Sequence, residues 1–160
     1  MIVVADSSPL HYLILLEQAE ILRHLYGNVL IPDAVAGELR AAASPQTVSA
    51  WVSNHPSWLR IVEVPAKDIV SIAGELDLGE RSAIALAERT GADLLLIDES
   101  AGRAEARRRS LRVTGTLGVL RAGAEARLLD VRNVVFRLQA TNFYVDEALL
   151  KTVFGKWLEE

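Results

Sequence analysis

The chain contains no cysteine and no long apolar run. The absence of cysteine from its 160 residues excludes disulfides, a thiolate nucleophile and cysteine-ligated zinc. No apolar run approaches the roughly 18 residues that a membrane-spanning helix needs. Met1 leads directly into an apolar stretch, with no basic segment of the kind that begins a secretory signal. We therefore expect a soluble cytoplasmic protein with no membrane segment.

The chain also lacks the excess of positive charge that is typical of a simple nucleic-acid binder, because its formal net charge is −4. One segment departs from this balance. The stretch "RAEARRRSLR" sets five arginines against a single glutamate, Glu105; these are Arg103, Arg107, Arg108, Arg109 and Arg112. Such a run either forms a solvated helix face or contacts phosphates, and the sequence leaves both open.

Several common catalytic motifs are missing. There is no G-x-x-x-x-G-K-[ST] phosphate loop, no G-x-G-x-x-G dinucleotide fingerprint and no G-x-S-x-G nucleophile elbow. The three histidines, His11, His24 and His55, lack H-x-x-x-H spacing, so we do not expect a zinc site. An aspartyl phosphatase would need a second aspartate two residues after Asp6, where Ser8 stands.

The apolar pattern predicts a single α/β domain over residues 1–160. Strand-like runs alternate with segments of helical periodicity, which indicates a three-layer α/β/α fold around a mainly parallel sheet. The predicted strands are 2–5, 29–31, 60–64, 93–97 and 111–115. The predicted helices are one from Leu10 through Glu17, then 32–42, 47–55, 80–91, 101–110, 117–129, 130–139 and 146–160. Residues 122–160 form a C-terminal helical extension that covers the sheet or forms an oligomer interface.

Two acids follow strand-like runs that are too apolar to favour a charge. Asp6 ends "IVVAD" and Asp98 ends "DLLLID". In sheets of this type ligands collect outside the carboxyl ends of the strands, where the strand order reverses, so both acids are candidate site residues. Helix capping is the alternative, since aspartate is a preferred N-cap residue.

Two further acids lie on predicted helices. Glu80 completes a capping box with Asp77 in "DLGE", yet it also begins the inward apolar stripe of its helix, where it would face a cleft. Glu38 lies at the edge of an apolar stripe, and its spacing alone does not make it catalytic. Carboxylates that converge without histidine or cysteine suit Mg²⁺ or Mn²⁺. Removing four acidic charges from −4 leaves 0, so the net charge does not exclude a nucleic-acid substrate.

Four segments in a fixed order resemble the PIN-domain nucleases, and specifically their VapC-like branch. They read "VVADSSPLHYL", "IPDAVAGEL", "LDLGERSAIALAE" and "LLLIDESAGRAEARRRSLRVTGTLGVL", and the similarity runs from residue 2 to about 121, so that 1–121 holds the core motifs. The resemblance implies a ribonuclease that hydrolyses RNA phosphodiester bonds and uses Mg²⁺ or Mn²⁺. Its four acids fall on Asp6, Glu38, Glu80 and Asp98, which would be both catalytic residues and metal ligands.

The resemblance also implies supporting residues and partners. Supporting polar positions fall on Ser7, Glu99, Thr114 and Thr116. RNA phosphates would be held by Arg103, Arg107, Arg108 and Arg109, since guanidinium groups bind phosphate bidentately. Members of this branch are commonly the toxin of a toxin–antitoxin pair, which implies an antitoxin protein that blocks the cleft and a homodimer through the helical layer.

Two features depart from the family pattern. The third acid is glutamate where many PIN domains have aspartate, and no clear counterpart of a later acid follows "IDES". The number of metal ions, one or two, therefore stays open. Two alternatives to the nuclease also stay open: a catalytically inactive PIN-like module for binding or assembly, and a phosphohydrolase of small molecules on the same sheet.

Overall fold

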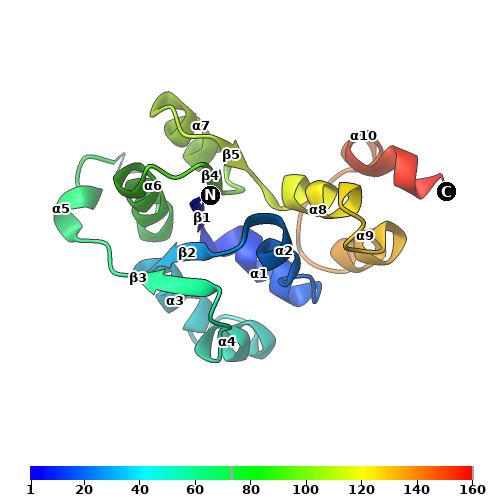
Figure 1. The fold of residues 1–160 in the computed structure, drawn as a ribbon, viewed down its shortest axis with the longest axis horizontal. Coiled ribbons are helices and arrows are strands. Elements are labelled where there is room, and N and C mark those ends of the chain that lie inside the picture. Colours follow the sequence, from blue (N-terminus) through cyan, green and yellow to red (C-terminus); the bar gives the residue numbers. More distant parts are fainter. Residues whose placement is uncertain (73, 160) are drawn as a thin grey trace.

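The computed structural model describes residues 1–72 and 74–159, and within them five short strands form one parallel sheet (Figure 1). The strands are β1 (Val3–Ala5), β2 (Val29–Pro32), β3 (Leu59–Val62), β4 (Leu94–Leu96) and β5 (Val113–Thr114). Their order across the sheet is β3-β2-β1-β4-β5. Each strand overlaps one of the predicted apolar runs, so the predicted parallel sheet is confirmed.

The described part of the chain has ten helices, of which the first seven connect the strands and the last three follow β5. They are α1 (Ser7–Leu15), α2 (Ile21–Tyr26), α3 (Asp33–Arg40), α4 (Gln46–Ser53), α5 (Ala66–Ile69), α6 (Leu78–Thr90), α7 (Ser100–Arg108), α8 (Thr116–Glu125), α9 (Val131–Gln139) and α10 (Glu147–Leu158). Eight overlap predicted helices. The sequence does not predict α2 and α5, because helices of 6 and 4 residues are too short to show a helical period.

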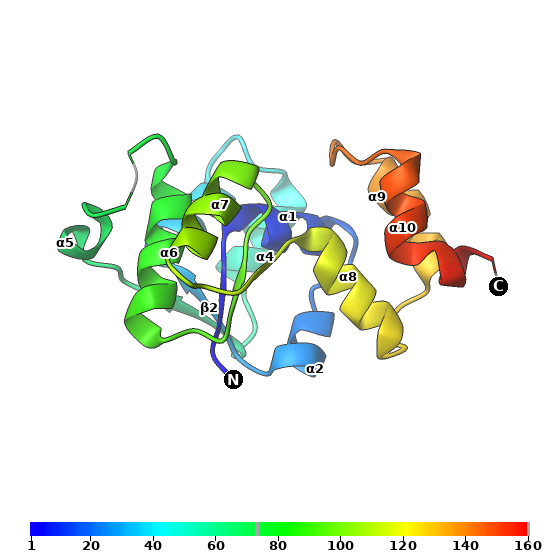
Figure 2. The same cartoon turned by 90° about the horizontal axis from the view of Figure 1, so that it is seen from above.

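The sheet is buried on both faces, as the apolar strands require. Val3 and Ala5 pack into one core with α1, α2, α3, α4 and α8, whereas Val4 packs into the other with α5, α6 and α7. This alternation follows from the two-residue period of a strand. Figure 2 shows α9 and α10 beyond α8, at the opposite end of the molecule from α5. The three-layer α/β/α architecture is therefore confirmed.

The strand order reverses at β1. The chain adds β2 and then β3 on one side of β1, and it returns to add β4 and then β5 on the other side. The connections that leave β1 and β4 therefore run in opposite directions, which opens the sheet edge at the carboxyl ends of these two strands. The backbone N–H of Asp6 donates to the Leu96 carbonyl over 2.9 Å, so the end of β1 is tied to the end of β4.

The C-terminal helices extend the core that α1 and α8 share. Leu150 and Phe154 of α10 are buried where α10 contacts α8 and α9. Side chains of Asp130 and Asp146 accept backbone N–H groups at the starts of α9 and α10, which fixes where these helices begin. In the described part of the chain, no helix has both the length and the apolar content to cross a membrane.

Candidate active site

Asp6 is a buried carboxylate at the end of β1. It occupies the N-cap position of α1, but its side chain makes no capping hydrogen bond, so capping does not account for it. The residue is 3% exposed, and its Oδ1 atom is buried with no hydrogen-bond partner in the described structure. A buried carboxylate oxygen without a partner is unfavourable unless the group binds a proton or a cation. Asp6 is thus placed to bind a positive ligand.

Glu38 reaches the same region from α3. Its carboxylate lies against Gly79 at the start of α6, where a Cβ atom would lie 2.8 Å from Glu38 Cδ and 3.0 Å from Oε2. Glycine at residue 79 therefore makes room for this side chain. Burial raises the pKa of Glu38, while hydrogen bonds from the Ser7 side chain and the Gly79 backbone lower it in part. Ser7 thus supports Glu38, at a position that the resemblance marks as supporting.

Glu80 both caps α6 and faces α7. Its backbone N–H donates to Asp77 Oδ1 over 2.8 Å, and its own Oε1 accepts the Asp77 N–H over 3.3 Å, which completes the capping box. Its other oxygen, Oε2, would lie 2.8 Å from a Cβ on Gly102 of α7. The capping interpretation of Glu80 is therefore confirmed. Its other oxygen lies close to Gly102 of α7, and the prediction that Glu80 faces a cleft stays a prediction.

Asp98 is held by three hydrogen bonds at the start of the connection from β4 to α7. Ser8 Oγ donates to Oδ2 over 2.8 Å, and Thr116 donates to Oδ1 through its backbone N–H and to Oδ2 through its hydroxyl, both over 2.7 Å. Glu99, not Asp98, takes the N-cap position of α7. Asp98 thus joins β4 to α1 and α8, and buried Thr116 orients its carboxylate.

The acids are close enough to influence one another's protonation. The pKa of Asp6 is raised to about 7, chiefly by burial and in smaller part by the charges of Asp77, Glu38 and Glu80, while a hydrogen bond from the Ser7 backbone opposes the shift. Burial also raises the pKa of Glu80 to about 7, with a contribution from its hydrogen bond to Asp77. Asp77 is therefore a fifth acid at this edge, which sequence reasoning had assigned to capping alone.

The donor set fits a hard divalent cation. All of the candidate ligands are carboxylate oxygens, which suit Mg²⁺ or Mn²⁺, and a cation would satisfy the buried Asp6 oxygen. Within the described residues, no three or more histidine, aspartate or glutamate side chains lie close enough together to hold a metal ion in their present conformations. The charges of Glu38 and Glu80 nevertheless act on Asp6 and raise its pKa, so a cation bound at Asp6 would offset the repulsion among these acids.

Two cavities border Glu38 and Asp98. One, of about 370 Å³, is lined by Ser7 and Glu38, and the other, of about 560 Å³, by Asp98 and Arg103. Both are also lined by Tyr12 and Asn142, whose side chains share a 2.7 Å hydrogen bond from the tyrosine hydroxyl to Asn142 Oδ1. Sequence reasoning missed both residues, because nothing local links positions separated by 130 residues.

The second cavity also contains supporting residues from the resemblance. Glu99 and Thr114 line it together with Gly115. A Cβ atom on Gly115 would lie 2.5 Å from Asp98 Oδ1 and 3.1 Å from the Arg103 guanidinium, so the arginine is a neighbour of this acid. Thr114 contacts Gly118 of α8 through its hydroxyl. Arg103 is accordingly the arginine of this run that faces the site.

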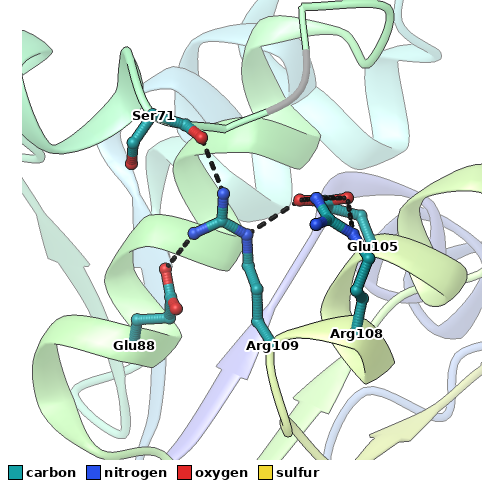
Figure 3. Close-up of polar contacts among 5 residues, drawn as sticks. All are labelled: Ser71, Glu88, Glu105, Arg108 and Arg109. Atoms are coloured by element: carbon teal, nitrogen blue, oxygen red, sulfur yellow. Dashed lines mark hydrogen bonds and ion pairs between the residues drawn. The ribbon is translucent and has the colours of Figure 1, made fainter.

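Two other arginines are engaged in ion pairs within the protein (Figure 3). Arg109 donates to Glu105 and Glu88, each over 2.8 Å, and to the Ser71 carbonyl over 2.6 Å. Arg108 donates to Glu105 through Nε over 3.0 Å. These contacts lie at the C-terminal end of α7, whereas the start of the helix lies at the site. Each residue of an α-helix adds about 1.5 Å to the separation between the two ends. Arg109 therefore holds α7 against α6, and Arg107 lies in the same final turn of α7.

Comparison with known families agrees with this arrangement. A family model described as a PIN domain matches residues 2–159, and it therefore includes α8, α9 and α10 as well as the segments that carry the sequence resemblance. No curated protein matches the chain. Because the family match covers all but the first and last of the 160 residues, the chain belongs to the PIN-domain family.

Proposed function

We propose that this PIN domain is an endoribonuclease that hydrolyses RNA phosphodiester bonds with Mg²⁺ or Mn²⁺. PIN domains are in general nucleases, which supports hydrolase activity at the coarse level. The observation that carries the proposal is Asp6. A carboxylate that is 3% exposed, with an unpartnered oxygen and other acids around it, is costly for the fold in its charged form, and a bound cation would remove that cost.

Asp98 differs from the other three acids in how its carboxylate is held. Asp6, Glu38 and Oε2 of Glu80 would hold the metal directly or through water, since Asp6 Oδ1 has no hydrogen-bond partner and the charges of Glu38 and Glu80 act on Asp6. Asp98 is already bonded to Ser8 and Thr116, so its carboxylate is fixed in orientation before any ligand arrives. When bound, the metal supplies a water of lowered pKa and neutralises charge on the phosphate.

The cationic part of the proposed site is Arg103. It lines the same cavity as Asp98 and would bind a phosphate next to the scissile one, because guanidinium offers paired donors to phosphate oxygens. The proposal assigns a structural role to Arg109, because its donors are taken by Glu88, Glu105 and Ser71. Arg107 and Arg108 would contribute only to the general attraction of RNA to this face.

The biological role is proposed from the resemblance alone. It favours the toxin of a toxin–antitoxin pair that acts in the cytoplasm, with an antitoxin segment covering the two cavities and a homodimer formed through the helical layer. Growth arrest on expression, relieved by a co-expressed protein encoded next to it, would support the toxin role. Growth unaffected by the active protein would contradict it without affecting the chemistry.

The chemistry is tested with a mixed RNA pool. Purified protein is incubated with RNA in the presence of Mg²⁺, Mn²⁺ or a chelator, beside Asp6→Asn and the control Asp68→Asn, which alters an acid of α5 whose ion pair with Arg89 is 3.7 Å long. We expect metal-dependent cleavage by the parent and the control, and none by Asp6→Asn. Absence of cleavage would favour an inactive binding module, and faster hydrolysis of nucleotide or sugar phosphates than of RNA would favour a small-molecule phosphohydrolase.

A further inference from the structure

The cavity of about 560 Å³ beside Asp98 has an aromatic wall that the acid chemistry does not require. The segment between α9 and α10 contributes Asn142, Phe143 and Tyr144 to its lining. Tyr144 is 91% exposed, and it makes no hydrogen bond or ring contact with another described residue. An exposed aromatic ring that lines a cavity is a surface on which a planar ligand can stack.

The segment that carries Tyr144 is fixed at both sides. Phe143 stacks edge-on against Tyr12 of α1, with ring centroids 4.9 Å apart, and Asn142 accepts the Tyr12 hydroxyl over 2.7 Å. On its C-terminal side, Asp146 accepts the Leu149 N–H over 2.7 Å and so begins α10. The ring of Tyr144 is therefore presented from an anchored loop, which reduces the entropy lost when a ligand stacks on it.

The rest of the same cavity has the chemistry of a nucleotide site. Arg103 and Asp98 both line it and both lie close to Gly115, where a phosphate near Asp98 would bind. Leu117, Leu149 and Val153 are also among the lining residues and offer apolar surface to the face of a base. A cation, an apolar wall and an exposed aromatic ring in one cavity match a nucleotide whose base is unpaired, because only an unpaired base has its faces free to stack.

We infer that Tyr144 forms a subsite that stacks one unpaired RNA base next to the scissile phosphate, with Phe143 and Tyr12 as the residues that position it. The inference rests on the proposed ribonuclease function and adds to it a residue that selects for unstacked RNA. The base enters the cavity between Tyr144 and the apolar wall, while the phosphate on its site-facing side lies against Arg103.

The subsite is tested in the Asp6→Asn background, in which we expect RNA binding without cleavage. The probe is a short labelled single-stranded RNA that contains a site cut by the parent, together with a series in which one base at a time is removed. Stacking on an aromatic side chain is worth about 1–3 kcal/mol per base, so we expect Tyr144→Ala to weaken binding by about tenfold and Tyr144→Trp to restore it. Removal of one particular base should weaken RNA binding by the Asp6→Asn protein, but not binding by the variant that also carries Tyr144→Ala.

The matched control is Phe136→Ala on α9, which removes an aromatic side chain that is 74% exposed and lines neither cavity. It should bind every probe as the Asp6→Asn protein does. Equal binding by Tyr144→Ala and the control, or an abasic series unaffected by Tyr144→Ala, would overturn the subsite. So would a change of oligomeric state on Tyr144→Ala, which would make the ring a protein contact. These outcomes leave metal-dependent cleavage by the parent intact, whereas absence of that cleavage overturns the proposed function as well.

Discussion

The Glu38 carboxylate lies where the Cβ atom of any other residue at position 79 would be. A Cβ built on Gly79 would be 2.8 Å from Glu38 Cδ. The start of α6 and the second turn of α3 therefore pack closely, because Gly79 leaves the space that the Glu38 carboxylate occupies. This relationship explains why Glu38, whose spacing in the sequence is unremarkable, is directed at the carboxyl edge of the sheet.

Gly79→Ala should lower cleavage activity strongly while leaving the fold intact. The added methyl group displaces the Glu38 carboxylate, which is the movable partner, so we expect weaker Mn²⁺ binding and at least a tenfold loss of kcat/KM, equivalent to about 1.4 kcal/mol of transition-state stabilisation. Mn²⁺ titration by calorimetry and cleavage rates at saturating metal measure the two effects separately.

Gly37→Ala is the matched control for this change. Gly37 is the neighbour of Glu38 on α3, and a Cβ there would meet nothing within 4 Å. Alanine inside a helix is more favourable than glycine by about 0.5–1 kcal/mol, so the control should raise the Tm slightly and keep full activity. Equal activity losses in both variants would contradict the role assigned to Gly79.

Asp6→Asn should abolish activity and stabilise the metal-free protein above neutral pH. Burial raises the pKa of Asp6 from 3.8 to about 7, so between these values the folded state binds more protons than the unfolded state, and the free energy of unfolding falls as the pH rises. One pKa unit corresponds to about 1.4 kcal/mol, which bounds the gain from removing the charge at about 4 kcal/mol.

Urea denaturation with a chelator present measures this difference. The parent and Asp6→Asn should diverge at pH 8 and come close together at pH 5, where Asp6 is protonated in the folded protein. Saturating Mn²⁺ at pH 8 should stabilise the parent more than the variant. If the parent protein were more stable than Asp6→Asn at pH 8 without metal, the charged Asp6 carboxylate would not destabilise the fold, and the prediction would be wrong.

Much of this site could be predicted from the sequence, because strand ends are visible there. Asp6 and Asp98 each follow a buried apolar run, and a parallel sheet brings the ends of such runs to one edge. Glu38 carries no comparable signal, and only the resemblance singles it out. Asp77 was missed because its capping role already explained it. Tyr12 and Asn142 meet across 130 residues, a contact that only the packing of α1 against the C-terminal segment creates.

The arginine run shows the same limit from the other direction. The sequence indicates only a cluster of positive charge, and it leaves open whether this cluster is a solvated helix face or a phosphate-binding site. The fold brings Glu88 and Ser71, which lie 21 and 38 residues away, to Arg109. These two contacts with residues distant in sequence engage a charge that looked available for RNA in a connection between α7 and α6.

Arg109→Met should therefore destabilise the protein while leaving RNA affinity nearly unchanged. The Arg109 side chain is 19% exposed and donates hydrogen bonds to Glu88, Glu105 and the Ser71 carbonyl. Its loss leaves the mostly buried Glu105 side chain with fewer partners, so we expect the Tm to fall by several degrees. Arg108→Met is the control, because its side chain is 70% exposed and such pairs contribute little. Thermal unfolding and anisotropy with labelled RNA give the two readings.

The same network predicts a dependence on acidity. Hydrogen bonds from Arg108 and Arg109 hold the pKa of Glu105 below its usual value, so the stabilisation is fully present above the ordinary glutamate range and is lost as the pH falls through the lowered pKa. The Tm difference between the parent and Arg109→Met should shrink accordingly in acid.

Arg103→Met should behave in the opposite manner to Arg109→Met, with normal stability and weaker RNA binding that depends less on salt.

Cleavage should not require the ribose 2′-hydroxyl at the cut position. The proposed nucleophile is water, and the described site offers carboxylates and a buried threonine rather than a histidine pair that would activate the RNA's own hydroxyl. An RNA with a single 2′-deoxynucleotide at a mapped cut site should therefore be cleaved within a few-fold of the normal rate, and its products should carry no cyclic phosphate. Loss of cleavage at that position alone, with cyclic phosphate on the products of the unmodified RNA, would mean that the substrate supplies the nucleophile, and the acids around Asp6 would then need a different assignment.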